Sequence, residues 1–190
     1  YYGDLALHVQ RRTVLPAKGH EAFTVRLPWG PCGFIIPWNF PFLLAGWGIG
    51  PAMAAGNTCV IKPAEDSPLS TLYLAHVAKD AGIPDGVINV IPGLGEVTGA
   101  ALAGNPNLKR MSFTGSPEIG REIASKCGAN LVPIKCELGG KGAAVVCDDV
   151  DIPDTAQKLV EAITFHTGQV CGDATRWLIQ KDIYDSFVSE

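Results

Sequence analysis

The chain has 190 residues, of which 47% are hydrophobic and 18% are charged, and this is enough for one α/β domain or for a domain with part of a second. The formal net charge is −4 and no dense cluster of lysine and arginine is present, which excludes the basic surface that a nucleic-acid partner requires. The longest apolar run, residues 42–55, is too short to cross a bilayer and is interrupted by glycines and a proline, so it is expected to be a buried segment and no membrane partner is predicted.

The hydrophobic pattern predicts an alternation of strands and helices. Residues 1–28 contain LALHVQ and FTVRL, whose alternation favours extended strands in an arm without a helix. Strands are then expected at 33–37, 58–63, 86–93, 109–115 and 143–149, with stretches of helical period between them. Helices are expected to begin at Ser67 and Ser116, each followed by proline, and to end at Gly82 and Gly128. This order predicts an α/β fold with a parallel sheet.

A second group of elements begins at Lys141. The strand at 143–149 is followed by a predicted helix at 154–166, a strand at 175–180 and the start of a further helix at 182–190. The pattern stops within that helix, so a second domain is expected to be incomplete in this chain.

The N-terminus and the cysteines bear on the cellular compartment. YYGDLALHVQRR lacks a charged segment followed by an apolar one, so no export signal is expected and a cytoplasmic location is the default. The six cysteines form no C-x-x-C pair and show no zinc-ligand spacing, so no metal site is predicted and most of them are expected to be small buried side chains. Cys171 differs, because it lies within TGQVCGDATR among glycine, glutamine and small residues.

The stretch SFTGSPEIGRE joins a strand, a Gly–Ser turn and a helix start. Backbone N–H groups and the positive end of the helix dipole would point at a ligand over this turn, which favours a phosphate site. Helix capping by Ser116 is the alternative interpretation, and the G-x-G-x-x-G fingerprint is absent.

Three further motifs place polar side chains where a ligand can bind. In VIKPAE, Lys62 and Glu65 follow a strand end and suit a ribose diol, with a solvated surface loop as the alternative. In PWNFP, prolines stiffen the corner around Asn39, whose amide can donate to an oxyanion or cap its own turn. In CELGGK, Glu137 precedes two glycines and can take a proton from water, or it is an ordinary charge at a strand terminus.

Taken together, these motifs resemble one family. PWNFP, KPAE, FTGS with Gly120 four residues beyond Ser116, ELGGK and GQVC stand in the order and spacing of the aldehyde dehydrogenase superfamily, over residues 1–190. The resemblance implies a partial Rossmann-like architecture, a parallel sheet with flanking helices, and an NAD(P)-dependent enzyme that oxidises an aldehyde to a carboxylic acid.

The resemblance also implies roles for individual residues. Cys171 resembles the nucleophile, whose thiolate attacks the aldehyde to give a thiohemiacetal and, after hydride transfer, a thioester. Asn39 resembles the oxyanion-hole donor, and Glu137 resembles the general base that activates water. The implied cofactor-binding residues are Ile36, Pro37, Trp38, Lys62, Glu65, Gly93, Phe113, Thr114, Gly115, Ser116, Ile119, Leu138 and Gly139.

Within that set, the parts of the cofactor are divided among the motifs. Lys62 and Glu65 resemble ligands of the adenosine ribose, and Ser116 with its turn resembles the pyrophosphate site. Trp38, with Leu138 and Gly139, resembles the surroundings of the nicotinamide. NAD is the expected cofactor because Glu65 would repel a 2′-phosphate, while Lys62 leaves NADP possible.

Family members are longer at both ends, so the chain is expected to be a central fragment with little activity alone. The implied division is an extended arm at 1–28 resembling part of an oligomerisation element, an incomplete NAD(P)-binding domain at 29–140, and the beginning of the catalytic domain at 141–190. The expected partners are a small aldehyde and, in the full-length protein, further copies of the chain in a dimer or tetramer. Gly172 and the run after it depart from many members, which leaves the aldehyde undefined.

Three alternatives remain at this point. A CoA-acylating semialdehyde dehydrogenase would resolve the thioester with CoA, but such enzymes typically lack a base at the position of Glu137. A cysteine hydrolase would use His166 as the base for Cys171, although their spacing gives poor geometry and no papain-like run is present. A non-catalytic binding or structural module is the third.

Overall fold

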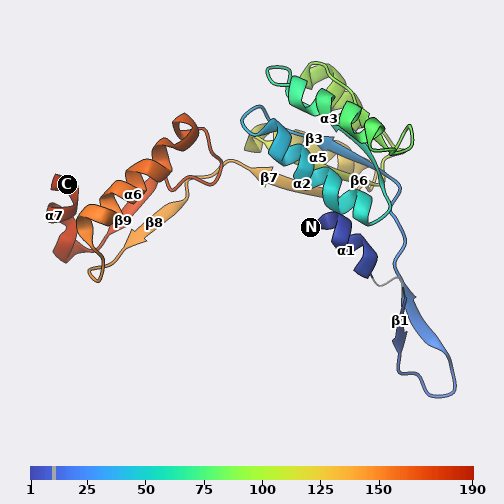
Figure 1. The fold of residues 1–190 in the computed structure, drawn as a ribbon, viewed down its shortest axis with the longest axis horizontal. Helices are drawn as coiled ribbons and strands as arrows, with labels where there is room; N and C mark the ends of the chain where they lie inside the picture. Colours follow the sequence, from blue (N-terminus) through green and yellow to red (C-terminus); the bar gives the residue numbers. More distant parts are fainter. Residues whose placement is uncertain (10–11) are drawn as a thin grey trace. The chain divides into compact units, whose positions relative to one another are not determined.

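The computed structural model describes residues 1–9 and 12–190, and Figure 1 shows its ribbon. Residues 10 and 11, which belong to the predicted arm at 1–28, lie outside the described residues. The described chain divides into two compact units, Tyr1–Glu137 and Leu138–Glu190, and each is described by itself.

The first unit is built on a five-stranded sheet with the order β5-β4-β3-β6-β7. Its strands are β3 (Pro31–Ile35), β4 (Thr58–Lys62), β5 (Ile88–Val90), β6 (Arg110–Gly115) and β7 (Ile134–Leu138). β3 pairs in parallel with both β4 and β6, and β4 pairs in parallel with β5. The predicted α/β fold with a parallel sheet is therefore confirmed.

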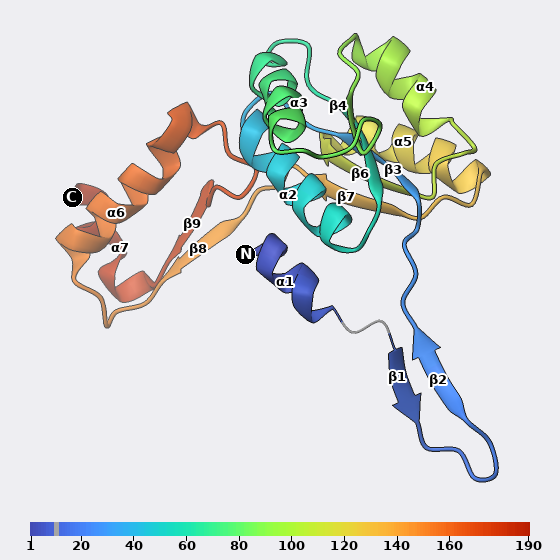
Figure 2. The ribbon, with the colours of Figure 1, turned by 45° about the vertical axis from the view of Figure 1, so that its right-hand side comes forward.

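Helices cover both faces of this sheet (Figure 2). They are α2 (Pro41–Ala54), α3 (Leu69–Asp80), α4 (Ala100–Ala103), which continues a π-helical turn η1 (Gly95–Gly99), and α5 (Pro117–Ala129). Successive side chains of β3 point to opposite faces, as the pleat requires. Cys32, Phe34 and Ile36 join a core cluster with Ala45 of α2, whereas Ile35 joins the cluster that includes residues of α4 and α5.

The N-terminal segment differs from the prediction. Residues 5–8, the first four of LALHVQ, lie in a helix, α1 (Tyr2–His8), and not in an extended strand. A Cβ added to Gly50 of α2 would lie 2.5 Å from the ring of Tyr2, so the ring packs directly on the glycine and this tertiary contact overrides the weak alternation. The FTVRL pattern does become a strand, because β1 (Arg12–Leu15) and β2 (Ala22–Val25) form an antiparallel hairpin.

The apolar run at 42–55 is only partly buried, contrary to the prediction. It forms α2, of which Ala45 and Ile49 are buried against the sheet. Phe42, Leu43 and Trp47 are each more than half exposed. The reason is that a helix presents only one stripe of its surface to its sheet, so these three side chains are left more than half exposed.

Of the two predicted helix starts, one is confirmed and the other is wrong. Ser116 is the N-cap of α5, and its hydroxyl oxygen accepts a hydrogen bond from the N–H of Ile119 at 3.3 Å, as predicted. α3 begins at Leu69, and Ser67 does not cap it. The Ser67 hydroxyl instead donates to the carbonyl oxygen of Trp38 at 3.1 Å, which ties the PWNFP corner to the start of α3.

Of the two predicted helix ends, one is likewise confirmed and the other is wrong. Gly82 follows α3 in the left-handed conformation with φ of +79°, as predicted. α5 continues past Gly128 to Ala129, and Leu131 takes the left-handed conformation in its place, with φ of +55°. This turn buries Val132 in the core, which explains why a costly conformation is accepted.

The second unit contains a two-stranded parallel sheet and two α-helices. Its elements are β8 (Ala143–Val146), α6 (Ile152–Thr164), the short helix η2 (Phe165–Gly168), β9 (Arg176–Ile179), the short helix η3 (Lys181–Ile183) and α7 (Tyr184–Ser189). Val146, Ala156 and Phe187 form its core. The strands and helices expected after Lys141 are therefore present.

The six cysteines differ in how far they are exposed. Cys32, Cys59 and Cys127 are buried, whereas Cys136 is half-buried and Cys147 and Cys171 are exposed. The expectation of a buried side chain is therefore wrong for Cys147, whereas Cys171 was expected to differ from the others. Among residues 1–9 and 12–190, no helix has the length and apolar character that a membrane crossing needs.

Candidate functional site

The first unit gathers most of the predicted site residues at one edge of its sheet. The chain runs from β3 to β4 and β5 on one side and returns to β6 and β7 on the other, so the order reverses between β3 and β6. Ligands of open parallel sheets bind outside the carboxyl ends of the strands at such a reversal. β3 ends at Ile35, β4 at Lys62 and β6 at Gly115, and the predicted residues that follow these ends therefore lie at a common edge.

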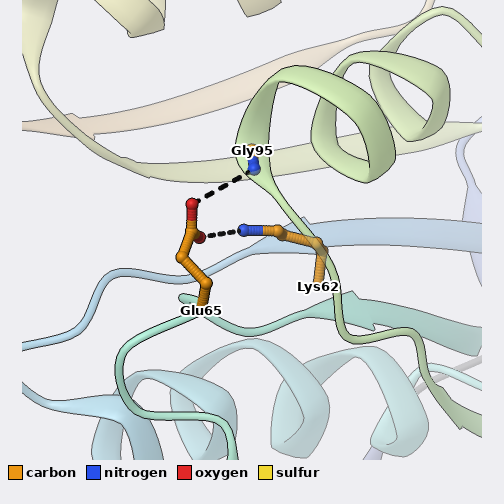
Figure 3. Close-up of polar contacts among 3 residues, drawn as sticks. All are labelled: Lys62, Glu65 and Gly95. Atoms are coloured by element: carbon orange, nitrogen blue, oxygen red, sulfur yellow. Dashed lines mark hydrogen bonds and ion pairs between the residues drawn. The ribbon is translucent and has the colours of Figure 1, made fainter.

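Lys62 and Glu65 form the best-defined polar contact at this edge, shown in Figure 3. The ammonium of Lys62 donates to one carboxylate oxygen of Glu65 at 2.6 Å, and the other oxygen accepts from the N–H of Gly95 at 3.3 Å. The Lys62 side chain is only 3% exposed, whereas that of Glu65 is 44% exposed. The structure thus holds the carboxylate between a buried cation and the first residue of η1.

This arrangement fixes the ionisation of Glu65. Its pKa is lowered from 4.5 to about 2, mainly by the hydrogen bond from Lys62, with smaller contributions from backbone N–H groups that include that of Gly95. Glu65 is therefore ionised throughout the neutral range. The pair still has capacity for a ligand, because an ammonium has three donors and a carboxylate accepts about four hydrogen bonds.

A cavity of about 550 Å³ opens beside Glu65. Its apolar walls come from β3, β6, η1 and α5, and three carboxylates also line it. The lining residues are Ile35, Glu65, Leu94, Gly95, Glu96, Gly99, Ala100, Phe113, Ile119, Glu122 and Ile123. Apolar walls with a small number of polar groups are typical of small-molecule sites.

Sequence reasoning missed part of this cavity. Glu65, Phe113 and Ile119 were predicted, but Gly95 and Glu96 were not. The available signal was the IPGLGE stretch, in which glycines directly follow the end of a strand and precede a helix.

The start of α5 shows capping geometry. Ser116 accepts from Ile119 through its side chain and from Gly120 through its carbonyl oxygen at 2.9 Å, and Pro117 has no N–H to offer. The Ser116 hydroxyl hydrogen and the N–H of Glu118 have no partner among the hydrogen bonds of the described chain. The capping interpretation is therefore right, and it leaves two donors for an anion.

Two of the predicted glycines are required by their surroundings. Gly93 has φ of +149°, and a Cβ there would collide with the hydroxyl oxygen of Thr98. A Cβ on Gly115 would lie 2.6 Å from the Phe113 ring, which packs across the turn. These glycines thus shape the edge independently of any ligand.

The PWNFP corner connects β3 to α2. Ile36 is buried, and its N–H extends the ladder by donating to the Lys62 carbonyl oxygen at 3.1 Å. Pro37 and Asn39 are half-buried, and Trp38 is about half exposed at 49%. The corner is thus anchored at Ile36 by the sheet and at Trp38 by the Ser67 hydroxyl.

Glu137 is the penultimate residue of β7 and the last residue of the first unit, and it forms an ion pair with Lys135 at 2.9 Å. Both side chains are about half exposed, so the pair is a weak one that water can replace. Glu137 and Thr114 also line a second cavity of about 310 Å³, on the α2 face of the sheet.

The second unit carries Leu138, Gly139 and Cys171. A Cβ on Gly139 would meet nothing within 4 Å in the described chain, so packing does not demand glycine there. Cys171 is exposed in a turn that the N–H of Asp173 closes by donating to the Val170 carbonyl oxygen at 3.3 Å.

The backbone before Cys171 is strained. His166, Thr167 and Gly168 all have positive φ, at 50°, 61° and 71°, and the first two are not glycine. Such conformations cost free energy and cluster at functional sites. By contrast, burial raises the pKa of Cys59 to about 12, which makes that thiol a poor nucleophile.

The sequence profile of the aldehyde dehydrogenase family matches residues 1–190. The chain belongs to this family. It is 41% identical to retinaldehyde dehydrogenase 3 of Mus musculus over 191 residues, which cover 99% of this chain and 37% of that protein. It therefore spans well under half the length of the aldehyde dehydrogenases that it matches.

Solved structures of similar proteins agree with the fold. PnpE in complex with nicotinamide adenine dinucleotide superposes with a TM-score of 0.95 at 40% identity, covering all of this chain and 39% of that chain. An NADP-dependent enzyme of E. coli superposes with a TM-score of 0.94 at 34% identity, covering all of this chain and 40% of that chain.

Proposed function

We propose that the chain is the part of an aldehyde dehydrogenase that binds NAD and supplies the nucleophile for oxidation of an aldehyde to a carboxylic acid. One observation carries the proposal: Lys62, Glu65 and the N–H of Gly95 form a polar group at the carboxyl edge of a parallel sheet, beside a cavity of about 550 Å³. Family membership and the NAD complex of PnpE support it.

The residues of this edge fit the adenosine half of the dinucleotide. Glu65 can accept hydrogen bonds from ribose hydroxyls while the remaining N–H groups of Lys62 donate to them. The apolar walls that include Leu94, Phe113 and Ile119 suit the adenine ring. The unused donors of Ser116 and Glu118 at the start of α5 suit the pyrophosphate.

The remaining predicted positions are assigned to the nicotinamide half. Trp38, Leu138 and Gly139 are assigned to the surroundings of the ring, Ile36, Pro37 and Thr114 to the strand ends, and Gly93 to the loop after β5. Bound NAD supplies a hydride acceptor at this ring.

Cys171 carries the covalent chemistry in this proposal. Its thiolate attacks the carbonyl carbon, the carbonyl electron pair moves to oxygen, and a thiohemiacetal oxyanion forms. The amide of Asn39 and the backbone N–H of Cys171 donate to that oxyanion. Collapse of the oxyanion would transfer a hydride from the same carbon to bound NAD, and the acyl group would remain on the sulfur as a thioester.

Glu137 completes the cycle as a general base. It takes a proton from a water molecule whose oxygen attacks the thioester carbon, and the acid leaves as the carbon–sulfur bond breaks. The half-exposed ion pair with Lys135 is weak enough to exchange for water at this step. A base at this position favours hydrolysis over transfer to CoA.

The wider expectations belong to the same proposal. They are a division into an arm at 1–28, an NAD-binding domain at 29–140 and the start of a catalytic domain at 141–190, a cytoplasmic location, and a homo-oligomer to which the β1–β2 hairpin contributes. The 190-residue chain by itself is expected to turn over little aldehyde.

The test compares Glu65→Gln with Asp66→Asn. Asp66 is the next residue, and its side chain forms no hydrogen bond or ion pair in the described structure, so Asp66→Asn removes the same charge without breaking a contact. Binding of NAD is measured by quenching of tryptophan fluorescence. Glu65→Gln is expected to raise the Kd by about 10- to 100-fold, because it removes charge-assisted hydrogen bonds. Equal affinities of the two variants and the unaltered protein would contradict the proposal.

A further inference from the structure

Three carboxylates, those of Glu65, Glu96 and Glu122, line the cavity of about 550 Å³, and no lysine, arginine or histidine is among its lining residues in the described chain. NADP differs from NAD by a phosphate of nearly two negative charges on the adenosine ribose. The charge of each carboxylate therefore bears on which dinucleotide can enter.

The three differ in how their charge is compensated. Glu65 is paired with the ammonium of Lys62 at 2.6 Å, and Glu122 with the ammonium of Lys126 at 3.6 Å. Glu96 makes neither an ion pair nor a hydrogen bond through its side chain with any other residue in the described parts of the chain.

Glu96 is also placed next to the ribose ligand. It directly follows Gly95, whose N–H donates to the carboxylate of Glu65 (Figure 3). Both residues belong to η1, so Glu96 is held by the same helical turn that holds the Glu65 carboxylate. Lys62 would attract a phosphate, but its charge is already balanced by Glu65.

We propose that Glu96 is a further specificity-determining residue, whose uncompensated charge rejects a dinucleotide with a 2′-phosphate. This inference rests on the proposed function, because it places the adenosine ribose beside Glu65. Glu96 acts through space, since it forms no hydrogen bond that its removal would break. Its charge therefore penalises NADP and leaves NAD, with a neutral ribose, almost unaffected.

The experiment measures the Kd of NAD and of NADP for the protein, for Glu96→Gln, for Glu122→Gln and for Glu21→Gln. Glu21 is exposed and lies outside the cavity, so its variant controls for overall charge. Glu96→Gln is expected to lower the Kd of NADP by about three- to tenfold, because it removes the Coulomb repulsion between the carboxylate and the 2′-phosphate across a partly solvated site. The Kd of NAD is expected to change by less than about twofold. Glu122→Gln is expected to have a smaller effect because Lys126 already offsets its charge, and added salt should reduce both.

The outcomes separate this inference from the proposed function. If the protein binds NAD but Glu96→Gln leaves the ratio of the two Kd values unchanged, or shifts it no more than Glu21→Gln does, the role of Glu96 is wrong and the proposed function stands. If the unaltered protein binds neither dinucleotide, the proposed function is wrong, and the inference falls with it.

Discussion

The pairing of Glu65 with Lys62 predicts a pH-dependent contribution to stability. In the folded chain the pKa of Glu65 is about 2, against 4.5 without its partners, chiefly because Lys62 donates to it at 2.6 Å. This difference corresponds to about 3 kcal/mol in the absence of screening. The Glu65 side chain is 44% exposed, so solvent reduces the expected contribution to about 1–2 kcal/mol.

The sign follows from the lowered pKa. The contribution is fully present above pH 4.5, where Glu65 is ionised in both the folded and the unfolded chain. It is lost as the pH falls towards 2, because the unfolded chain then binds a proton before the folded chain does. Glu65→Gln is therefore expected to destabilise the protein at pH 7 by about 1–2 kcal/mol, and this deficit should shrink as the pH is lowered from 5 to 3.

Urea unfolding, followed by tryptophan fluorescence at a series of pH values, measures the deficit. Glu21→Gln is the control, because Glu21 is exposed and forms no ion pair with any of the described residues; its deficit should stay near zero at every pH. A Glu65→Gln deficit that is the same at pH 7 and pH 3 would refute the reasoning, because it would show that the charge of Glu65 is not what stabilises the fold.

Further predictions concern the turns and the nucleophile. Gly93→Ala is expected to lower the free energy of unfolding by about 1–3 kcal/mol, because residue 93 has a positive φ and an added Cβ would collide with Thr98. Gly139→Ala is expected to lower it by less than about 0.5 kcal/mol, because its added Cβ would meet nothing within 4 Å, and urea unfolding of both variants measures the difference. Ser116→Ala should cost about 1 kcal/mol by removing the N-cap of α5, whereas Ser186→Ala, in the short helix α7, should not; equal losses would contradict the capping role. Cys171→Ser is expected to abolish aldehyde oxidation by the full-length protein while leaving the Kd of NAD within about twofold, and residual turnover above one per cent of the original would contradict a cysteine nucleophile.

Much of the fold was predictable because its signals are local. The strands at Thr58–Lys62 and Arg110–Gly115 are short apolar runs bounded by turn residues, and Ser116-Pro117 is a helix start whose geometry depends on adjacent residues. The placement of Lys62 and Glu65 at the sheet edge was predictable for a similar reason, since Lys62 ends a strand of a parallel sheet and Glu65 comes three residues later.

The remaining features depend on contacts between distant parts of the chain. Helix α1 is favoured by the packing of Tyr2 on Gly50, and the LALHVQ pattern does not predict that contact. The contribution of Gly95 comes from a backbone N–H, which every residue except proline carries, so its residue type does not reveal this particular contact. Ser67 was misassigned because its hydroxyl bonds to Trp38, 29 residues earlier, and not to its own helix.

The most direct test of the central claim is a rapid-quench experiment on the full-length protein with NAD and an aldehyde. Absorbance of the reduced nicotinamide and mass spectrometry of the quenched peptides are recorded together. The account predicts that reduced cofactor forms with an acyl group on the peptide containing Cys171, and that the acyl group persists longer in Glu137→Gln because thioester hydrolysis is slowed. Reduced cofactor without any acyl group on Cys171 in either protein would contradict it.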